Sequence, residues 1–371
     1  MADVFDIAVI GGGLTGKAAA VVAARAGFST VHIAPAAPLD RRTSALMLPS
    51  VDFMRKAGLI GEPSGLGVPL ESIRIIDATE RLLRAPETLF ESSEFGHEAF
   101  GWNFANERLG ATFENAASGL DNLSIRETTL ATAERDDAFW TLALTDGTKV
   151  QVRLLVGADG KASSVRKLAG IEAREHRFKQ SALVCDLEIE RPLDGCSTEF
   201  HYPDGPFTLV PAGGNKANLV WIDKAPVLEA ARRDAEILAA ALAEKSMREF
   251  GQLTPATPSF VFPLSTLSVD VAGKNAAVLV GEAAHAFPPI GAQGLNLGLR
   301  DVEDLAACLT AANPGAWGWA DGVARAYAQS RAGDLTRTGA FVDSLFRSLL
   351  SDWLPAQALR SGGLWALKMI P

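Results

Sequence analysis

The sequence contains few cysteines, and their positions exclude two kinds of cross-linked protein. Three occur among 371 residues, at Cys185, Cys196 and Cys308. Because their number is odd and no two of them have CxxC spacing, we expect neither a disulfide framework nor a zinc site. A reducing cytosol suits such a chain, and no metal is expected.

The chain also lacks an excess of positive charge, an export signal and a long apolar run. Its 35 Lys and Arg residues are outnumbered by 44 Asp and Glu, and the net charge of −9 would repel nucleic acid. The N-terminus shows no basic region followed by a cleavable apolar stretch. The longest uncharged segments, 283–299 and 305–320, are interrupted by glycine and proline. We therefore expect a cytoplasmic protein whose membrane contact would be peripheral, at the inner face of the membrane.

What the sequence does contain begins with a β-α-β unit at its start. Residues 6–10 read as a short buried strand, which leads into the loop 11–16 with the sequence GGGLTG. An alanine-rich helix follows and ends at Gly27, and residues 29–33 read as a second strand. The unit predicts the first part of an α/β domain.

The loop carries the GxGxxG fingerprint of dinucleotide-binding folds. Gly11 permits a tight turn, Gly13 lets a pyrophosphate approach the backbone, and Gly16 lets the helix pack close to the strand. Free N–H groups at the helix start, beginning at Leu14, would face the phosphates. The motif predicts a dinucleotide site, with a purely structural turn as the alternative. The acidic residue that usually binds the ribose is missing, because Ala34 stands there.

The rest of the chain alternates between segments typical of strands and of helices. Residues 141–144 and 149–156 flank an Asp-Gly pair and predict a hairpin. Between 182 and 262 short alternating segments are separated by proline and glycine, which is typical of an antiparallel sheet. Further elements expected from the pattern are a helix over 227–250, a buried strand over 275–280 and a helix over 295–309.

Two later segments each place a carboxylate just past a buried strand, LVGADG at 155–160 and VGEAAH at 280–285. With them, the chain resembles the single-component flavin monooxygenases of the p-hydroxybenzoate hydroxylase fold. Within that group it is similar to the ubiquinone-biosynthesis hydroxylases of the UbiH/UbiF type. The resemblance extends over essentially the whole chain, and the block GEAAHAFPPIGAQGLNLGLRD at 281–301 is highly specific as a unit.

The resemblance implies a mixed α/β fold: a Rossmann-like FAD-binding domain with an inserted, mostly antiparallel substrate sheet. The implied division is 1–72, 100–180 and 268–340 for FAD, 73–99 and 181–267 for the substrate, and 341–371 for a C-terminal helical segment. Flavin-binding elements recur far apart in the sequence, so neither part is expected to fold well alone.

The resemblance also implies FAD as the cofactor and NAD(P)H as a transient reductant. The residues implied to bind the cofactor are Gly11, Gly13, Leu14, Gly16, Arg42, Asn106, Asp159, Gly160, Glu282, Gly294, Leu295 and Asn296. Glu282 stands where the family usually has aspartate, which displaces its oxygens by one methylene. Independently of the resemblance, a helix that starts after Gly294 would aim N–H groups at an anionic ligand.

Several of these residues also have a structural interpretation. Asp159 could cap the turn before its helix, and Arg42 could be a solvated surface residue. His285 is expected to be structural, because nothing in the sequence pairs it with a nucleophile.

The resemblance implies hydroxylation of an electron-rich phenol by O2 through a C4a-hydroperoxyflavin, so few catalytic side chains are needed. No acid or base is assigned. Pro289, Gly291 and Gln293 are predicted to shape the cavity, with strand residues near Val210 and Trp221 as the opposite wall.

The predicted substrate is a polyprenyl phenol of ubiquinone biosynthesis. Its tail would need an apolar channel, or the same side chains could form an ordinary core: Phe200, Phe207, Val210, Trp221, Phe260 and Phe262. The Leu- and Trp-rich segment 341–371 could contact a membrane, a second subunit or the flavin domain.

The alternatives are a hydroxylase of another small aromatic or lipid substrate, and a catalytically decayed subunit of a quinone-biosynthesis complex. A halogenase is disfavoured, because Trp317-Gly-Trp319 lacks the rest of the Trp-x-Trp-x-Ile-Pro signature.

Overall fold

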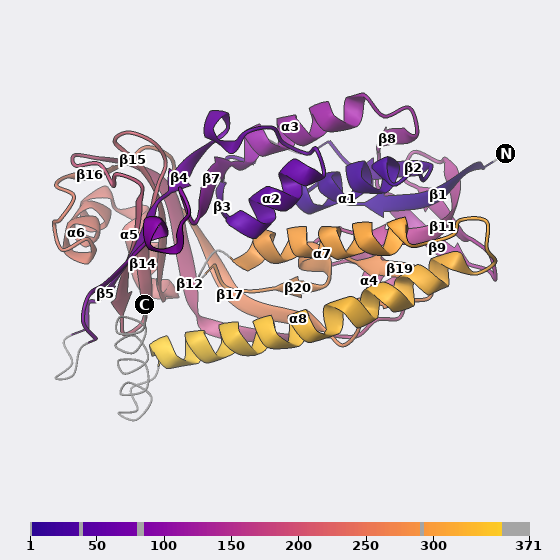
Figure 1. Ribbon diagram of the computed structural model, residues 1–371. Coiled ribbons are helices and arrows are strands. Elements are labelled where there is room, and N and C mark those ends of the chain that lie inside the picture. Colours follow the sequence, from indigo (N-terminus) through magenta and orange to yellow (C-terminus); the bar gives the residue numbers. More distant parts are fainter. Residues whose placement is uncertain (1, 37–39, 80–84, 290–292, 351–371) are drawn as a thin grey trace.

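The structure is a computed structural model that describes residues 2–36, 40–79, 85–289 and 293–350, with side chains described up to 335 and at 337. Within these residues it contains an eight-stranded sheet, a nine-stranded sheet and a small three-stranded sheet. Figure 1 shows the two large sheets at opposite ends of an elongated molecule. Segments from distant parts of the chain meet in each sheet.

The predicted β-α-β unit is the centre of the first sheet. Strand β1 (Asp3–Ile10) is joined to β2 (Thr30–Ala34) through helix α1 (Leu14–Arg25), and β1 pairs in parallel with β2 and with β11 (Lys149–Gly157). The remaining strands are β8 (Leu123–Glu127), β9 (Leu130–Arg135), β10 (Trp140–Leu144), β18 (Gly273–Lys274) and β19 (Ala277–Leu279). Because the main path, β18-β19-β11-β1-β2-β8, is largely parallel, the carboxyl ends of the central strands meet at one edge. The predicted hairpin is confirmed as β10 and β11.

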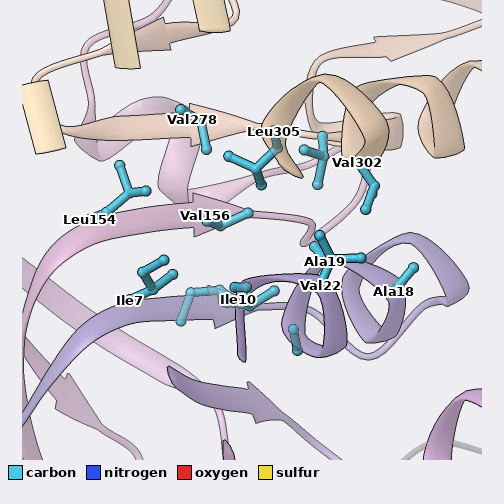
Figure 2. Packing of buried hydrophobic residues seen from close by; sticks show 14 of the residues in the cluster. Ile7, Ile10, Ala18, Ala19, Val22, Leu154, Val156, Val278, Val302 and Leu305 are labelled. Atoms are coloured by element: carbon cyan, nitrogen blue, oxygen red, sulfur yellow. The ribbon is translucent and has the colours of Figure 1, made fainter. Parts of the chain in front are cut away.

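Apolar side chains pack this sheet against two helices. Figure 2 shows side chains of β1, β11 and β19 facing small residues of α1 and branched residues of α7 (Gln293–Thr310). The exposed fraction is at most 1% for each of these core residues: Ile7, Ala19, Val156, Val302 and Leu305. Alanines in α1 allow the helix to approach the strands closely, and this fixes the position of its N-terminus at the glycine loop.

The second sheet is almost entirely antiparallel, as the sequence predicted. Its order is β20-β17-β12-β15-β14-β13-β5-β6, with β16 beside β12, and the β13–β5 pair is parallel. Its strands are β5 (Ser72–Asp77), β6 (Thr88–Glu91), β12 (Ala173–Ile189), β13 (Cys196–Tyr202), β14 (Gly205–Pro211), β15 (Lys216–Lys224), β16 (Leu253–Pro255), β17 (Phe260–Val269) and β20 (His285–Ala286).

The single helix predicted over 227–250 is wrong. The segment forms α5 (Ala225–Arg233) and α6 (Ala235–Lys245), which are separated at Asp234. There the backbone is extended, with φ −128° and ψ 114°, and the carboxylate accepts hydrogen bonds from the N–H groups of Glu236 and Ile237. Aspartate in this position is a strong N-cap. The apolar spacing continues across the break, so the periodicity alone did not reveal it.

The small sheet and the remaining helices complete the described part of the fold. They are β3 (Thr43–Met47), β4 (Gly67–Leu70), β7 (Gly101–Ala105), α2 (Leu48–Lys56), α3 (Asn106–Ser118), α4 (Ser164–Leu168) and α8 (Trp319–Leu350), with short 3-10 turns η1 (Pro63–Gly65), η2 (Ser92–Phe95) and η3 (Gly281–Ala283). The predicted helix over 295–309 is confirmed as α7.

The predicted C-terminal segment is only partly covered by the structure. The backbone of α8 continues through position 340 to Leu350. The side chains of 341–350 and all of 351–371 lie outside the described residues. Among the helices of the described residues, none is long and apolar enough to cross a membrane.

Candidate functional site

A cavity of about 1080 Å³ extends from the glycine loop to the second sheet. One side is formed by the glycine loop, β3, the loop 158–160, η3 and the start of α7. The other side is formed by β5, β13, β14 and β15. The volume reaches the upper end of the range of small-molecule sites, which span roughly 300–1,000 Å³. It suits a large cofactor together with a second molecule.

The three fingerprint glycines have different surroundings in the structure. A Cβ on Gly11, whose φ is +124°, would lie 2.1 Å from the carbonyl oxygen of Ala158, and one on Gly16 would lie 2.1 Å from the oxygen of Gly11. A Cβ on Gly13 would meet no atom within 4 Å. Gly11 and Gly16 therefore pack the loop tightly against β11 and α1, whereas Gly13 borders open cavity space.

The N-terminus of α1 is open toward the cavity. No side chain caps it, and Gly13 and Leu14 both line the cavity. A helix N-terminus with free N–H groups and a positive dipole end is suited to phosphate oxygens. These features fit the diphosphate of a dinucleotide.

His32 holds the glycine loop in place, and sequence reading missed it. Its Nε2 lies 2.9 Å from the carbonyl oxygen of Gly11. A carbonyl only accepts, so Nε2 donates. Burial lowers the pKa of His32, a shift that the bond to Gly11 opposes and the charge of Lys17 supports. The sequence signal for this contact is a histidine in the second strand of the β-α-β unit, at a position where a buried strand usually has an aliphatic residue.

The pKa shift of His32 predicts a loss of stability in mild acid. Because its folded-state pKa lies below the ordinary value of about 6.5, the neutral form stabilises the fold fully above that pH. Stability is lost as the pH falls from 6.5 toward the folded-state pKa. We expect the thermal midpoint to fall more steeply below pH 6.5 in wild type than in His32→Leu. A matched His97→Leu change, at an exposed site, should keep the wild-type slope. Equal slopes for wild type and His32→Leu would refute this role.

The rim near Ala34 offers hydroxyl groups in place of the missing carboxylate. Ile33, Pro35, Thr128 and Thr129 line the cavity there. The hydroxyls of both threonines lie 3.0–3.1 Å from that of Thr145. Backbone and hydroxyl groups are therefore the polar groups that line this end of the cavity.

Arg42 and Asn106 belong to one polar network at the edge of the cavity. Both guanidinium contacts from Arg42 to Asp40 measure 2.8 Å, and Asn106 donates to the same carboxylate at 2.9 Å. Ser44 in turn donates to Asn106 at 2.7 Å. Burial would raise the pKa of Asp40, but the hydrogen bonds from Arg42 and Asn106 outweigh it, so the pKa is lowered. Asp40, which sequence reading missed, thus holds Arg42 at the rim, although the Arg42 side chain is 69% exposed.

Asp159 helps to cap the start of α4, whose N-cap residue is Ser163, in line with the structural alternative. Its carboxylate accepts from the backbone N–H of Ser164 at 2.6 Å and of Val165 at 3.2 Å, and from the hydroxyl of Ser163. Asp159 and Gly160 also line the cavity. The cap fixes this loop where it crosses the glycine loop.

The family block places its residues around the start of α7. Glu282, Pro289, Gln293, Gly294 and Leu295 line the cavity. Gly291 lies outside the described residues.

Asn296 is turned toward β3. Its Oδ1 accepts from the N–H of Met47 at 2.9 Å, and its Nδ2 donates to the carbonyl of Ala45 at 2.9 Å. The side chain thus ties α7 to β3, and its contact with a cofactor stays a prediction.

The second sheet presents a polar and apolar face to the cavity. Its lining residues are Ile73, Ile75, Ser197, Glu199, His201, Thr208, Val210, Asn218 and Val220. On β13, Glu199 and His201 point the same way, and Nε2 of His201 lies 3.2 Å from the Glu199 carboxylate. Sequence reading missed this pair, because alternation on a strand does not tell which face borders a cavity.

Val210 lines the cavity as predicted, but the placement of Trp221 is wrong. Trp221 is 2% exposed and packs with Phe200 and Phe207 on the opposite face of the sheet, against α5 and α6. Its neighbour Val220 faces the cavity instead. Successive strand residues point to opposite faces, so a shift of one position reverses the assignment.

The six apolar residues considered for a substrate channel fall into three groups. Phe200, Phe207 and Trp221 form core, and Val210 lines the cavity. Phe260 and Phe262 are 56% and 46% exposed, with ring centroids 6.3 Å apart. The core alternative therefore applies to three of the six.

His285 belongs to a buried ionic cluster behind the family block. It is 2% exposed, and its Nε2 lies 2.6 Å from Oδ2 of Asp301, which also accepts from the N–H of Gly281 at 2.8 Å. Nε of Arg331 lies 2.8 Å from Oδ1 of Asp301. Burial opposes the charge on Arg331, but Asp301 and its neighbouring carboxylates raise the pKa of the guanidinium. The cluster fastens η3 to α7 and α8, which agrees with a structural role for His285.

Comparisons with known proteins agree with this geometry. Residues 4–331 match the model of a family described as FAD binding domain. The ubiquinone hydroxylase UbiL of Rhodospirillum rubrum is 31% identical over 98% of this chain and 86% of its own. The 3-demethoxyubiquinol 3-hydroxylase of Escherichia coli is 27% identical over 97% of this chain and 94% of its own. The solved structure of PqsL from Pseudomonas aeruginosa superposes with a TM-score of 0.84, at 22% identity, over 98% of this chain and all of its own.

The chain therefore belongs to the FAD-binding family of flavoprotein monooxygenases. It is an FAD-dependent monooxygenase with the predicted mixed α/β fold of the p-hydroxybenzoate hydroxylase type, and NAD(P)H is the typical reductant of the family.

Proposed function

We propose that this enzyme hydroxylates the ring of an uncharged phenol that carries an isoprenoid chain, an intermediate of ubiquinone biosynthesis, with O2 and NAD(P)H as co-substrates. The observation that carries the proposal is the continuous cavity between the glycine loop and the second sheet. It would bring a bound cofactor and a ring-shaped substrate into one space. The names of the curated relatives supply the pathway.

In this proposal the glycine loop side of the cavity holds FAD. The N-terminus of α1 would bind the diphosphate through Gly13 and Leu14. Arg42 supplies positive charge at the rim, and Gly294 and Leu295 offer the N–H groups of the α7 start. When bound, FAD supplies the redox chemistry and the activation of O2. The chain's own residues bind the cofactor, position the ring and exclude water.

The charge of the lining supports an uncharged substrate. Among the described lining residues, Arg42 is the one Lys or Arg, and it belongs to the glycine loop side. The sheet side carries Ile73, Ile75, Val210 and Val220 with hydroxyl, amide, Glu199 and His201 groups. A carboxylated aromatic would find no Lys or Arg among the described lining residues there, and burying an unpaired carboxylate is costly. A neutral phenol avoids this cost.

We also infer the division into an FAD-binding part, 1–72, 100–180 and 268–340, and a substrate part, 73–99 and 181–267. The membership of the two large sheets supports it, since β1, β2, β8 to β11, β18 and β19 form one sheet and β5, β6, β12 to β17 and β20 the other. The two-residue strand β20 joins the second sheet from within the first part. Strand β12 begins in the first part and continues in the second.

The proposal predicts a product that gains one oxygen atom from O2. Purified, FAD-loaded protein would be supplied with NADH or NADPH, 2-prenylphenol and 18O2. We expect a product 18 mass units heavier than the phenol, because one 18O atom is inserted into a ring C–H bond and the hydrogen is retained in the new hydroxyl group. Oxidation of the nicotinamide with release of peroxide and no labelled product would contradict the proposal.

A further inference from the structure

We propose that His201 is the catalytic base that removes the proton from the phenol, and that Glu199 is its positioning residue. The inference rests on the proposed function and names how the same cavity activates its substrate. Both residues belong to β13 and line the sheet side of the cavity. The side chain of His201 is 11% exposed and that of Glu199 is 20% exposed.

The contact between the two side chains fixes the tautomer of the imidazole. Nε2 of His201 lies 3.2 Å from Oε2 of Glu199. A carboxylate accepts hydrogen bonds and cannot donate one, so Nε2 carries the hydrogen. The neutral ring then has its free lone pair on Nδ1, which has no hydrogen-bond partner among the described residues. A partly enclosed imidazole with one nitrogen held by a carboxylate and the other open is arranged to accept a proton.

The other ionisable residues of the lining are already engaged or lie elsewhere. Asp40 binds Arg42 and Asn106, and Asp159 caps α4. Glu282 belongs to η3, beside the glycine loop. Among the described lining residues, His201 is thus the basic nitrogen on the sheet side.

The charged groups on the elements that surround His201 have partners of their own, so Glu199 is the carboxylate that contacts its ring. On β5 the register partner of His201 is Asp77, whose carboxylate accepts from Thr79 and from the N–H of Ala85. On β14 the partner is Pro206, which has no charge. The nearby charged groups Arg74 and Lys245 contact other partners: Arg74 binds Glu87 and Glu249, and Lys245 lies over the Tyr202 ring.

The proposed step is a single proton transfer. The phenol O–H bond breaks, its electron pair stays on oxygen, and the proton forms an N–H bond at Nδ1 of His201. The products are a phenolate and an imidazolium, and the Glu199 carboxylate stabilises the positive ring. Phenolate is a stronger electron donor than phenol, so the ring becomes more reactive toward an electrophilic oxygen.

The test compares two phenols of different acidity in FAD-loaded protein. One is 2-prenylphenol, which is neutral at pH 7.5, and the other is a polyfluorinated 2-prenylphenol, which is ionised at that pH. A base that removes the phenolic proton contributes roughly 10²–10⁴-fold. We expect His201→Asn to lower kcat for the neutral phenol by about 100-fold or more, and for the ionised phenol by less than about 10-fold. His176→Asn, at an exposed position of β12, serves as the matched control and should keep both rates.

Glu199 is tested by graded replacement. Glu199→Gln should lower kcat for the neutral phenol selectively, and Glu199→Asp should restore part of the loss, while the Kd for FAD stays unchanged in both. If His201→Asn does not fold, the two Glu199 variants still test the role of the pair. Equal loss of rate with both phenols, or no loss with either, would overturn the assignment of the pair while leaving the proposed function intact. A wild-type enzyme that hydroxylates neither phenol would overturn the proposed function together with the assignment.

Discussion

Replacing Gly11 with alanine should give a protein that purifies without bound FAD. The new Cβ would lie 2.1 Å from the carbonyl oxygen of Ala158 and 2.4 Å from its carbonyl carbon. Neither atom can move aside easily, because the N–H of Ala158 donates to the carbonyl of Ile10 at 2.8 Å. The φ of +124° adds strain. Strain of about 1–3 kcal/mol from such a backbone and the overlap together should weaken FAD binding roughly 100-fold or more.

Gly27→Ala is the matched control for this change. Gly27 also has a positive φ, +91°, but a Cβ there would meet no atom within 4 Å. It should therefore suffer the conformational strain without the overlap, and its flavin content should remain that of wild type. Both variants would be purified and titrated with FAD by fluorescence quenching. Wild-type FAD affinity in Gly11→Ala would contradict the role given to the loop.

Asp301→Asn should be the most destabilising polar substitution in the family block. Asp301 is 1% exposed, and its carboxylate meets His285, Arg331 and the N–H of Gly281. Arg331 keeps the carboxylates of Asp304 and Asp334, at 2.9 and 2.7 Å. The amide nevertheless leaves buried polar groups of the cluster without their acceptor, at a cost of about 1–3 kcal/mol or more. The loss should also release η3, so we expect weaker FAD retention together with the lower free energy of unfolding.

Asp321→Asn provides the comparison on α8. Asp321 pairs with Arg135 at 2.6 Å, but the two side chains are 32% and 25% exposed. A solvated pair of this kind contributes about 1 kcal/mol or less. Urea unfolding of both variants would measure the difference. If Asp301→Asn lost no more stability than Asp321→Asn, the buried cluster would not hold the block as described.

Local patterns were sufficient for the parts of the fold that follow sequence periodicity. The strand before Gly11, the alanine-rich helix after it and the hairpin at Asp146 all form where the residues predicted them. The break at Asp234 was missed, because the capping hydrogen bonds outweighed an apolar spacing that continues through it. The sequence signal for the break is aspartate directly before an alanine-rich run, a pattern typical of a helix start.

Site residues that belong to a contiguous motif could be predicted from the sequence. Those whose position depends on the pairing of strands could not. The glycines stand in a row, so the tight turn at Gly11 and the close packing at Gly16 could be predicted directly. Glu199 and His201 gain their position from the pairing of β13 with its chain neighbour β14 and with β5, which is far away in the sequence. The same register places Val220 at the cavity and Trp221 in the core. His32 on β2 reaches Gly11 at the end of the neighbouring strand β1, 21 residues earlier in the chain.

The activity proposed for this chain is the hydroxylation of a quinone-precursor phenol. The most direct measurement is to express it in bacterial cells that each lack one quinone-ring hydroxylase, and to identify the accumulated prenyl phenols and quinones by mass spectrometry. We expect one or more strains to regain ubiquinone while the intermediate lacking a single oxygen disappears. Gly11→Ala, expressed at the same level, should restore none. Unchanged intermediates in every strain, with FAD-loaded wild-type protein present, would contradict the claim.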